Sequence, residues 1–435
     1  MKDVRIWKQE LREGAHAARL ASLYCCAPED TAPQAARYAA ALDGLEAAFG
    51  PHSAAALFSA PGRTEIGGNH TDHNNGVVMA AAVDLDILAV VAKNDDNCVR
   101  LISHGFGKID DIDLSVLTPQ PEESEHSASL IRGVAAGFAQ RGGKLGGFDA
   151  YSTSHVLRGS GLSSSAAFEV CLGAIFRSEY NGGGFEKFSQ VEIAKIGQYA
   201  ENVFFGKPSG LLDQTACAVG SAISIDFKDP AAPVVEKVAF DLAAKGYALC
   251  ISDTKGSHAD LTDDYAAIRR EMESVAACFG KKVLREVDEQ DFLAAIPAVR
   301  AKTGDRAVLR AIHFYNECRR AVALREAVER DEFDVFLRLI IAGGHSSFEY
   351  NQNAYSIHAP QQQGVPLALA ISQSVLEGRG AWRLQGGGFA GTIQAFVPLD
   401  LLDTYRAAID GVFGAGSCHV LTVRNHGAIE VVPEL

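Results

Sequence analysis

One stretch constrains the fold of this chain more than any other: a glycine-serine loop that leads directly into a helical pattern. The stretch reads Arg158-Gly-Ser-Gly-Leu-Ser-Ser-Ser-Ala-Ala-Phe-Glu-Val170. Glycines at 159 and 161 let the backbone turn tightly and approach a ligand closely, which a Cβ would prevent. Apolar residues then recur at the spacing of one helix face: Phe168, Cys171, Leu172, Ile175 and Phe176. Because Asn181-Gly-Gly-Gly184 is a strong helix end, we predict a buried helix between the loop and these glycines.

The loop is also a potential anion site. A helix N-terminus exposes unpaired N–H groups and the positive end of the helix dipole, so phosphate is the natural ligand. The structural alternative is that Ser163 or Ser164 simply caps a core helix. The loop lacks the Gly-Lys-Ser/Thr ending of a P-loop, and Gly161-Leu-Ser-Ser-Ser165 lacks the final glycine of a hydrolase nucleophile elbow. From the loop alone, phosphate binding and helix capping both stay open.

Length and charge narrow the possible functions. A chain of 435 residues exceeds one typical hydrophobic core, so two domains are expected. The net charge of −14 argues against partners such as nucleic acid or an anionic membrane, because both require basic patches. A small anionic ligand interacts mainly with the charges of its own pocket. A phosphate site is therefore compatible with this net charge.

The chain is expected to be cytoplasmic. Its nine cysteines show no zinc-type Cys-x-x-Cys pairing, which favours reduced thiols. The first residues, Met1-Lys-Asp-Val-Arg-Ile-Trp-Lys8, lack the apolar segment of a signal peptide. The most apolar stretch, residues 77–92, is interrupted by Asp84 and Asp86, so no membrane span is predicted. Residues 1–50 are alanine-rich and amphipathic, a pattern that predicts helices.

Residues 61–76 are rich in turn formers and in side chains that bond sugar hydroxyls. His70, Asp72 and His73 lack the i, i+4 helical spacing of a zinc protease, so hydrogen bonding to structure or substrate is favoured over a transition metal. Residues 83–91 and 98–102 read as strands, with a hairpin turn at 94–97 between them.

Two acidic residues stand out in the next segment. A helix is predicted over residues 186–205, and Glu201 lies near its C-terminal end, where the helix dipole disfavours a carboxylate. Glu201 is either a solvated surface residue or a cation ligand. Asp213 follows in a mostly apolar context, where an unpaired charge is costly. It either caps a helix or is held for chemistry.

A third glycine-rich segment lies near the C-terminus. Gly386-Gly-Gly-Phe-Ala-Gly391 matches the dinucleotide-binding pattern Gly-x-Gly-x-x-Gly. A Rossmann fold requires a helix next, whereas Thr392-Ile-Gln-Ala-Phe-Val397 alternates like a strand, so that interpretation fails. A Pro-marked linker at 229–233 indicates a domain boundary.

Together these segments resemble the GHMP small-molecule kinases and, within them, the galactokinase family. Residues 61–76 resemble the galactokinase signature, residues 161–166 the phosphate loop of the superfamily, and residues 386–391 its third motif. Ala200-Glu201 and Gly210-Leu-Leu-Asp-Gln214 also match galactokinase segments, and the stretch ending at Tyr265 does so more loosely. The resemblance covers the chain from about residue 42 to the C-terminus.

The resemblance implies a two-domain α/β (α+β) fold with the active site in the cleft between the domains. It divides the chain into an N-terminal helical extension (1–41), an N-terminal kinase domain (42–230) and a C-terminal kinase domain (231–435). ATP would bind at Gly159, Gly161, Leu162, Ser163, Ser164, Ser165 and Ala166. Mg²⁺ would be held by Ser165 and Glu201, with Asp213 as the base and Arg63 stabilising the transferring phosphoryl group. The sugar-binding residues would be Glu65, Asn69, His70, Asp72, Gly210 and Tyr265. A monomer or weak dimer is expected.

The sequence departs from the galactokinase signature at informative positions. Glu65 stands where the signature usually has Asn, and Asn69 stands where it usually has Glu. The catalytic positions match, which favours phosphorylation of the anomeric hydroxyl of galactose. The alternatives are the same chemistry on galacturonate or N-acetylgalactosamine, and a non-catalytic sugar sensor. An amide at position 69 can bond a hydroxyl, a carboxylate or an acetamido group.

Overall fold

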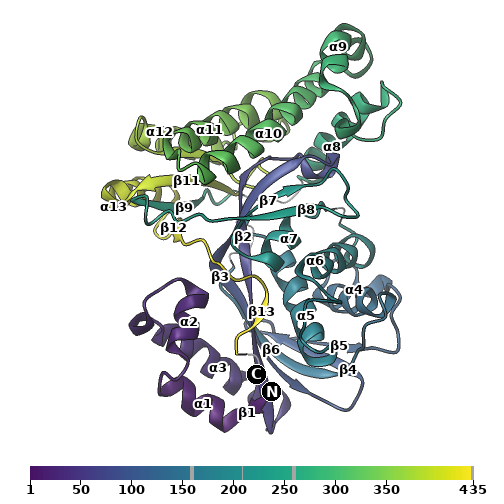
Figure 1. Cartoon of the computed structure of the whole chain (residues 1–435), viewed down its shortest axis with the longest axis vertical. Coiled ribbons are helices and arrows are strands. Elements are labelled where there is room, and N and C mark those ends of the chain that lie inside the picture. The colour runs from purple at the N-terminus through teal and green to yellow at the C-terminus, as the bar shows by residue number, and fades with distance from the viewer. Residues whose placement is uncertain (157–160, 208, 257–260, 433–435) are drawn as a thin grey trace.

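Two β-sheets and their helices build the molecule (Figure 1). The computed structural model describes residues 1–156, 161–207, 209–256 and 261–432. Within these residues, nine strands form one sheet and four strands form a second. The strands of the larger sheet are β1 (Lys2–Asp3), β2 (Ala54–Gly67), β3 (Val77–Lys93), β4 (Cys98–Ser103), β5 (Ile109–Asp113), β6 (Phe148–Ser154), β7 (Ala222–Asp226), β8 (Val234–Val238) and β13 (Ile429–Glu430). The mixed α/β architecture expected from the resemblance is confirmed.

The long strand β3 holds the larger sheet together. Its first part, from Val77 to Ala81, pairs with β7, and its last part, from Ile87 to Lys93, pairs with β6. Strand β2 pairs with β3 along most of its length. One end of β3 therefore belongs to the region of the catalytic candidates, and the other end carries β6, β4 and β5.

The predicted hairpin at residues 94–97 is wrong. Strands β3 and β4 lie where the sequence placed them, but β6 is inserted between them, antiparallel to β3 and parallel to β4. The turn signal at 94–97 marks a real reversal of the chain. Which strand pairs with which, however, is decided by residues about fifty positions later, and local turn chemistry does not encode such a partner.

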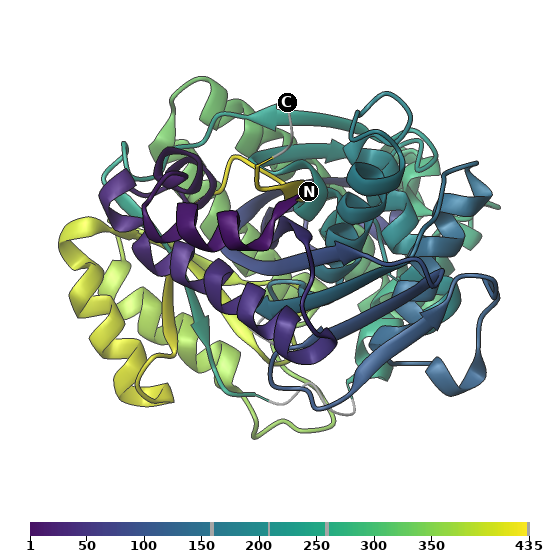
Figure 2. The same ribbon diagram turned by 90° about the horizontal axis from the view of Figure 1, so that it is seen from below.

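Both faces of β2 are buried, which is why this strand is apolar without alternation. Ala55 and Leu57 pack against three N-terminal helices on one face, while Ala56 and Phe58 belong to the main core on the other. The N-terminal helices are α1 (Val4–Arg12), α2 (Ala17–Tyr24) and α3 (Ala32–Phe49), as the alanine-rich pattern predicts. Seen from below in Figure 2, they lie across the sheet.

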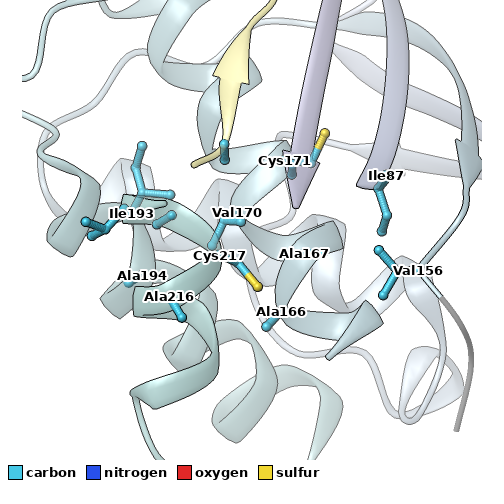
Figure 3. Close-up of a cluster of buried hydrophobic side chains, with 14 of the residues drawn as sticks. Ile87, Val156, Ala166, Ala167, Val170, Cys171, Ile193, Ala194, Ala216 and Cys217 are labelled. Carbon is cyan, nitrogen blue, oxygen red and sulfur yellow. The ribbon is translucent and has the colours of Figure 1, made fainter. Parts of the chain in front are cut away.

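The opposite face is covered by α4 (Ser127–Gln140), α5 (Ser164–Tyr180), α6 (Gln190–Tyr199) and α7 (Leu212–Val219). Helix α5 is the helix predicted after the glycine-serine loop, and it ends directly before Asn181. Small side chains let α5 approach its neighbours closely, as Figure 3 shows for Val170 of α5, Ala194 of α6 and Ala216 of α7. This packing fixes the N-termini of α5 and α7 side by side.

The second sheet and six helices make up most of the C-terminal half of the described chain. Its strands are β9 (Tyr247–Asp253), β10 (Ala381–Leu384), β11 (Thr392–Pro398) and β12 (Cys418–Leu421). The helices are α8 (Thr262–Ala277), α9 (Glu289–Thr303), α10 (Asp305–Glu329), α11 (Phe333–Ser346), α12 (Gly364–Leu376) and α13 (Leu402–Phe413). Strand β11 directly follows the glycine-rich segment, as predicted. The domain division near residue 230 stays a prediction; β8 and β13, which follow that residue, pair within the larger sheet.

Residues 61–67 continue β2, although they belong to the segment that is rich in turn formers. The strand tolerates Pro61 and the glycines because its register against β3 shifts between Pro61 and Arg63 and again between Glu65 and Gly67. Such irregularities bend a strand and re-aim its side chains. None of the helices in the described ranges is both long and apolar enough to cross a membrane.

Candidate active site

Arg63 and Asp213 form the centre of the site. Arg63 comes from the bent part of β2, and Asp213 comes from the first turn of α7. Nε of Arg63 donates to Oδ1 of Asp213 at 2.8 Å, and Nη2 lies 2.7 Å from the same oxygen. Nη1 of Arg63 donates to the carbonyl of Gly161. Hydrogen bonds of this pair therefore connect the glycine-serine loop with β2 and with α7.

The surroundings of Asp213 favour its ionised form. Burial raises the pKa of Asp213, but the charge of Arg63 and the hydrogen bonds from Ser163 and Arg63 outweigh it, so the pKa is lowered overall. Arg63 is only 6% exposed, yet its pKa is raised, because the attraction of Asp213 and Glu65 exceeds the cost of burial. Asp213 is thus a carboxylate at neutral pH and can accept a hydrogen bond or a proton.

Ser163 does not cap α5 with its side chain. It occupies the N-cap position in a left-handed backbone conformation, φ 58°, and its hydroxyl donates to Oδ2 of Asp213 at 2.5 Å. The helix-cap interpretation of Ser163 is therefore wrong for the hydroxyl group. Gly161 also has a positive φ, 67°, which its lack of a Cβ permits. The N–H groups of the first turn of α5 receive no side-chain cap from Ser163.

Glu201 is buried, so its interpretation as a solvated surface residue is wrong. It lies in a π-helical turn, Ala200–Phe205, that extends α6, and it is 2% exposed. Its Oε1 accepts a 3.1 Å hydrogen bond from Ser165 Oγ and contacts Lys207 Nζ at 2.9 Å. The π-turn widens the helix by one residue and is a common feature of functional sites.

Gln214 holds Glu201 from the other side. Its Nε2 donates to Glu201 Oε2 at 2.9 Å and to Glu169 Oε2 at 3.0 Å. Burial, followed by the charge of Glu201, raises the pKa of Glu169 well above its usual value. Gln214 therefore joins the carboxyl group of Glu169 to the carboxyl group that faces Ser165.

A cavity of about 1310 Å³ opens beside the first turn of α5. Ser164 and Ser165 line one side, as expected for a phosphate loop. Leu162 and Ala166 are 0% and 1% exposed and belong to the core, so neither residue lines the cavity. The predicted ATP-binding residue Gly159 lies outside the described residues.

Much of the rest of the cavity comes from segments that the sequence analysis did not assign to a site. They are residues 103–110, residues 151–156, and α3, which contributes Arg37. Phe106 is 45% exposed in a short polar, glycine-containing segment, and this exposed aromatic ring is the one local signal that could have been noticed. Arg37 carries no signal, because its place in the cavity depends on how α3 packs on the sheet.

Asp72 and Gly210 lie in direct contact. A Cβ on Gly210 would stand 1.7 Å from Oδ2 of Asp72, so no other residue fits at position 210 unless Asp72 moves. Burial, and then the charge of Asp213, raises the pKa of Asp72 to about 6. The structure therefore brings Asp72, Gly210 and Asp213 together, as predicted for a shared substrate site.

Three predicted sugar-binding side chains donate to successive carbonyls of the third glycine-rich segment. Asn69 Nδ2 bonds Gly386 O at 2.7 Å, His70 Nε2 bonds Gly387 O at 2.9 Å, and Tyr265 OH bonds Gly388 O at 3.0 Å. Because a carbonyl only accepts, His70 carries its proton on Nε2. Burial lowers the pKa of His70 to about 4, so the ring is neutral. Nowhere in the described segments are three or more His, Cys, Asp or Glu side chains placed to hold a metal ion together.

Asn69 has no hydrogen-bonding capacity left for a sugar. It is 0% exposed; besides Gly386 its Nδ2 donates to Glu65 Oε1 at 2.9 Å. Its Oδ1 accepts from Asn353 and Ser347 at 3.0 and 3.3 Å. With two donors and two acceptor positions used, the amide is complete. This geometry argues against the predicted sugar contact of Asn69 and makes it a scaffold residue.

Glu65 is the hydrogen-bond partner of Asn69, and its charge also acts on Arg63. Its Oε1 receives the bond from Asn69 and lies 3.4 Å from Arg383 Nη2, while Oε2 has no partner among the described side chains. Burial raises the pKa of Glu65 to about 7, against the lowering effects of Arg383 and Arg63. Glu65 and Asn69, the two exchanged residues of the signature, are thus hydrogen-bonded to each other. Of the two, only Glu65 has an oxygen that accepts no hydrogen bond from a described side chain.

Comparisons with known proteins agree with this geometry. Residues 45–93 match the galactokinase galactose-binding signature, and residues 129–221 match the N-terminal domain of GHMP kinases. A galactokinase of Streptomyces coelicolor is 31% identical over 363 residues, covering 82% of this chain and 89% of that protein. A galactokinase of Actinobacillus pleuropneumoniae is 32% identical over 361 residues, with the same coverage of both chains.

Solved structures show the same fold. The galactokinase of Lactococcus lactis in complex with galactose superposes with a TM-score of 0.77 at 22% identity, covering 91% of this chain and all of that one. A mevalonate kinase superposes with a TM-score of 0.57 at 13% identity, covering 84% of this chain and 99% of that one.

Proposed function

The chain belongs to the galactokinase family of the GHMP kinases, and from this premise we propose that it transfers the γ-phosphoryl group of ATP to the anomeric hydroxyl of galactose. The observation that carries the proposal is the Asp213 carboxylate, held by Arg63 and Ser163 at the edge of the α5 N-terminus. Phosphoryl transfer needs positioned groups and charge neutralisation more than covalent chemistry, and this arrangement supplies both.

Asp213 accepts the proton of the anomeric hydroxyl as that oxygen bonds to the γ-phosphorus. The bond between the γ-phosphorus and the bridging oxygen breaks, and ADP leaves with the electron pair. Arg63 keeps Asp213 ionised and places a guanidinium beside the phosphoryl group, where negative charge is spread over its oxygens. Ser163 fixes the second carboxylate oxygen, so the free lone pairs of Asp213 are oriented by two neighbours.

ATP fits the cavity beside Ser164 and Ser165, with its phosphates at the N-terminus of α5. Ser165 and Glu201 fit a Mg²⁺ ion, because both offer hard oxygen atoms and these lie 3.1 Å apart. Mg²⁺ commonly takes one or two protein ligands and completes its shell with phosphates and water. Bound there, the ion would neutralise charge on the phosphates of ATP.

The acidic surroundings of the sugar position favour galactose over galacturonate. Glu65, Asp72 and Asp213 act on one another electrostatically, and a uronate carboxylate would add a further negative charge to this group. Neutral hydroxyl groups can donate to the same oxygens. A non-catalytic sensor is disfavoured, because Asp213 and the loop serines are present and Ser163 donates a hydrogen bond to Asp213.

The test is an ATP-consumption assay over a panel of free sugars, followed by phosphorus NMR of the product. We expect turnover on galactose and a phosphate on the anomeric carbon. Phosphate on the primary C6 hydroxyl, or a clear preference for galacturonate or N-acetylgalactosamine, would contradict the assignment. Absence of turnover on every sugar, with intact galactose binding, would restore the sensor hypothesis.

A further inference from the structure

Lys207 places a positive charge at the point where the proposed magnesium ligands meet. Its Nζ lies 2.9 Å from Glu201 Oε1, the same oxygen that accepts the hydrogen bond from Ser165. The side chain of Lys207 is 59% exposed, whereas that of Glu201 is 3% exposed. The ammonium group therefore stands at the open side of a buried carboxylate, next to the first turn of α5.

The backbone of Lys207 is anchored to the same residue. Its N–H donates to the carbonyl of Glu201 at 3.1 Å and so closes the π-turn, after Gly206 N–H has done the same at 3.0 Å. The Cα of Lys207 is thus held in place while its long side chain remains accessible to solvent. Because the lysine side chain has four flexible carbons, its ammonium group can move by several ångströms while the backbone stays in place.

The charges around Lys207 favour a role beyond neutralising Glu201. Asp213 and Glu169 also act on its charge, which puts the ammonium within the electrostatic reach of the catalytic carboxylate. Arg63 is already bound to Asp213 and to the Gly161 carbonyl. The triphosphate of ATP would bring further negative charge to this region, and lysine binds phosphate as a mobile point charge.

We propose that Lys207 is a phosphate-binding residue of the kinase: it pairs with Glu201 in the nucleotide-free protein and contacts the terminal phosphates of ATP in the complex. The proposal rests on the proposed function, because it requires ATP at the α5 N-terminus. The physical reason for the exchange is that a buried carboxylate needs a cation. A divalent ion bound with ATP takes over this task and frees the ammonium group for the phosphates.

The experiment measures binding rather than turnover. Calorimetry should compare AMP with the non-hydrolysable triphosphate analogue AMP-PNP, each with Mg²⁺, on the full chain and on Lys207→Met. We expect Lys207→Met to bind AMP-PNP roughly 10- to 100-fold more weakly, the range for one lost hydrogen bond to a charged group. AMP binding should stay within about 2-fold, as for a surface substitution that loses no ligand contact. Lys207→Arg should recover most of the affinity.

Lys195→Met is the matched control, because Lys195 lies on α6 in the same region and forms its contacts with Glu192 and the Ala231 carbonyl. It should bind both nucleotides as the wild type does. Equal AMP-PNP affinity in Lys207→Met and wild type, or equal losses for AMP and AMP-PNP, would overturn the phosphate-binding role and leave Lys207 a structural partner of Glu201. A wild type that fails to bind AMP-PNP at all would refute the proposed function, and the role of Lys207 with it.

Discussion

The two sides of the proposed active site direct their polar side chains to different partners. The transfer side consists of Arg63, Ser163, Ser165, Glu201 and Asp213. Here side chains bond mainly to one another, and Ser165 also lines the cavity. The signature side consists of Glu65, Asn69, His70, Asp72 and Tyr265. Three of these five residues donate to backbone carbonyls of Gly386, Gly387 and Gly388.

The difference explains why one side keeps the family pattern while the other departs from it. In the proposed mechanism each residue of the transfer side has its own chemical role, so a substitution there removes that role. On the signature side, Glu65 and Asn69 form a hydrogen-bonded pair, and exchanging an acid for an amide within a pair preserves one donor and one acceptor. Substitutions on this side are therefore expected to compensate each other, whereas substitutions on the transfer side are not.

The largest effect is expected on the transfer side, for Asp213→Asn. The variant should fold and bind nucleotide, but its kcat should fall by about 10²–10⁴-fold, because an amide cannot accept the hydroxyl proton. Steady-state kinetics with galactose and ATP would measure this. As a control, Asp229→Asn changes an exposed carboxylate that bonds only its own loop and should leave kcat unchanged. Near-wild-type kcat in Asp213→Asn would remove this residue from the chemistry.

The second prediction tests whether substitutions of Glu65 and Asn69 on the signature side compensate each other in stability. Asn69→Glu places a second carboxyl group against Glu65 at a position with 0% exposure and removes the donor to Gly386. We expect the free energy of unfolding to drop by about 3–5 kcal/mol, the range for an uncompensated buried charge. Denaturant unfolding would show it. The double variant Glu65→Asn/Asn69→Glu should recover most of the loss.

The same variants test the choice of sugar. We expect the wild type and the double variant both to prefer galactose over galacturonate and N-acetylgalactosamine when kcat/KM values are compared. If the wild type is inactive on galactose and the double variant gains this activity, the exchange has altered the substrate. If the single variants Asn69→Glu and Glu65→Asn lose stability additively and the double variant recovers nothing, the pair is not a compensating unit.

The next prediction concerns Glu201→Gln on the transfer side, where we expect a smaller effect on the rate. Loss of one charged oxygen ligand should raise the Mg²⁺ concentration for half-maximal rate by roughly 10- to 100-fold, and Ser165→Ala should act in the same direction. A double-mutant cycle on the magnesium midpoint would then show coupling between the two positions. A magnesium dependence unchanged in both variants would separate Glu201 and Ser165 from metal binding.

The smallest expected effect concerns Glu65, whose protonation should make the free energy of unfolding depend on pH. Its pKa is raised from 4.5 to about 7 in the folded protein, so the folded state binds the proton more tightly than the unfolded state. The resulting stabilisation is complete below pH 4.5 and is lost as the pH rises through about 7. Relative to Glu65→Gln, the wild type should lose about 2 kcal/mol between pH 5 and 7.5. Parallel stability curves for the two proteins would contradict this.

Local patterns predicted several features correctly. The apolar spacing after the glycine-serine loop placed α5, and the alternation after Gly391 placed β11, because helix and strand periods are properties of neighbouring residues. The same reasoning failed for the partner of β3, since β6 enters the sheet from a distant segment. It left Glu201 open between a surface residue and a cation ligand, because the burial of Glu201 follows from the contacts of the π-turn with α5 and α7 rather than from its own neighbours.

The sequence by itself determined the elements, the motif order and the residue types for phosphoryl transfer. These depend on short-range spacing: the loop glycines, the serines before α5 and the acidic residue at the start of α7 each lie within one element. Only the tertiary structure decided that Asn69 is buried scaffold while Glu65 keeps an unused oxygen, and that Arg37 lines the cavity. The reason is that Asn69 bonds Gly386 across 317 residues of chain, and such a contact exists only after both sheets have packed together.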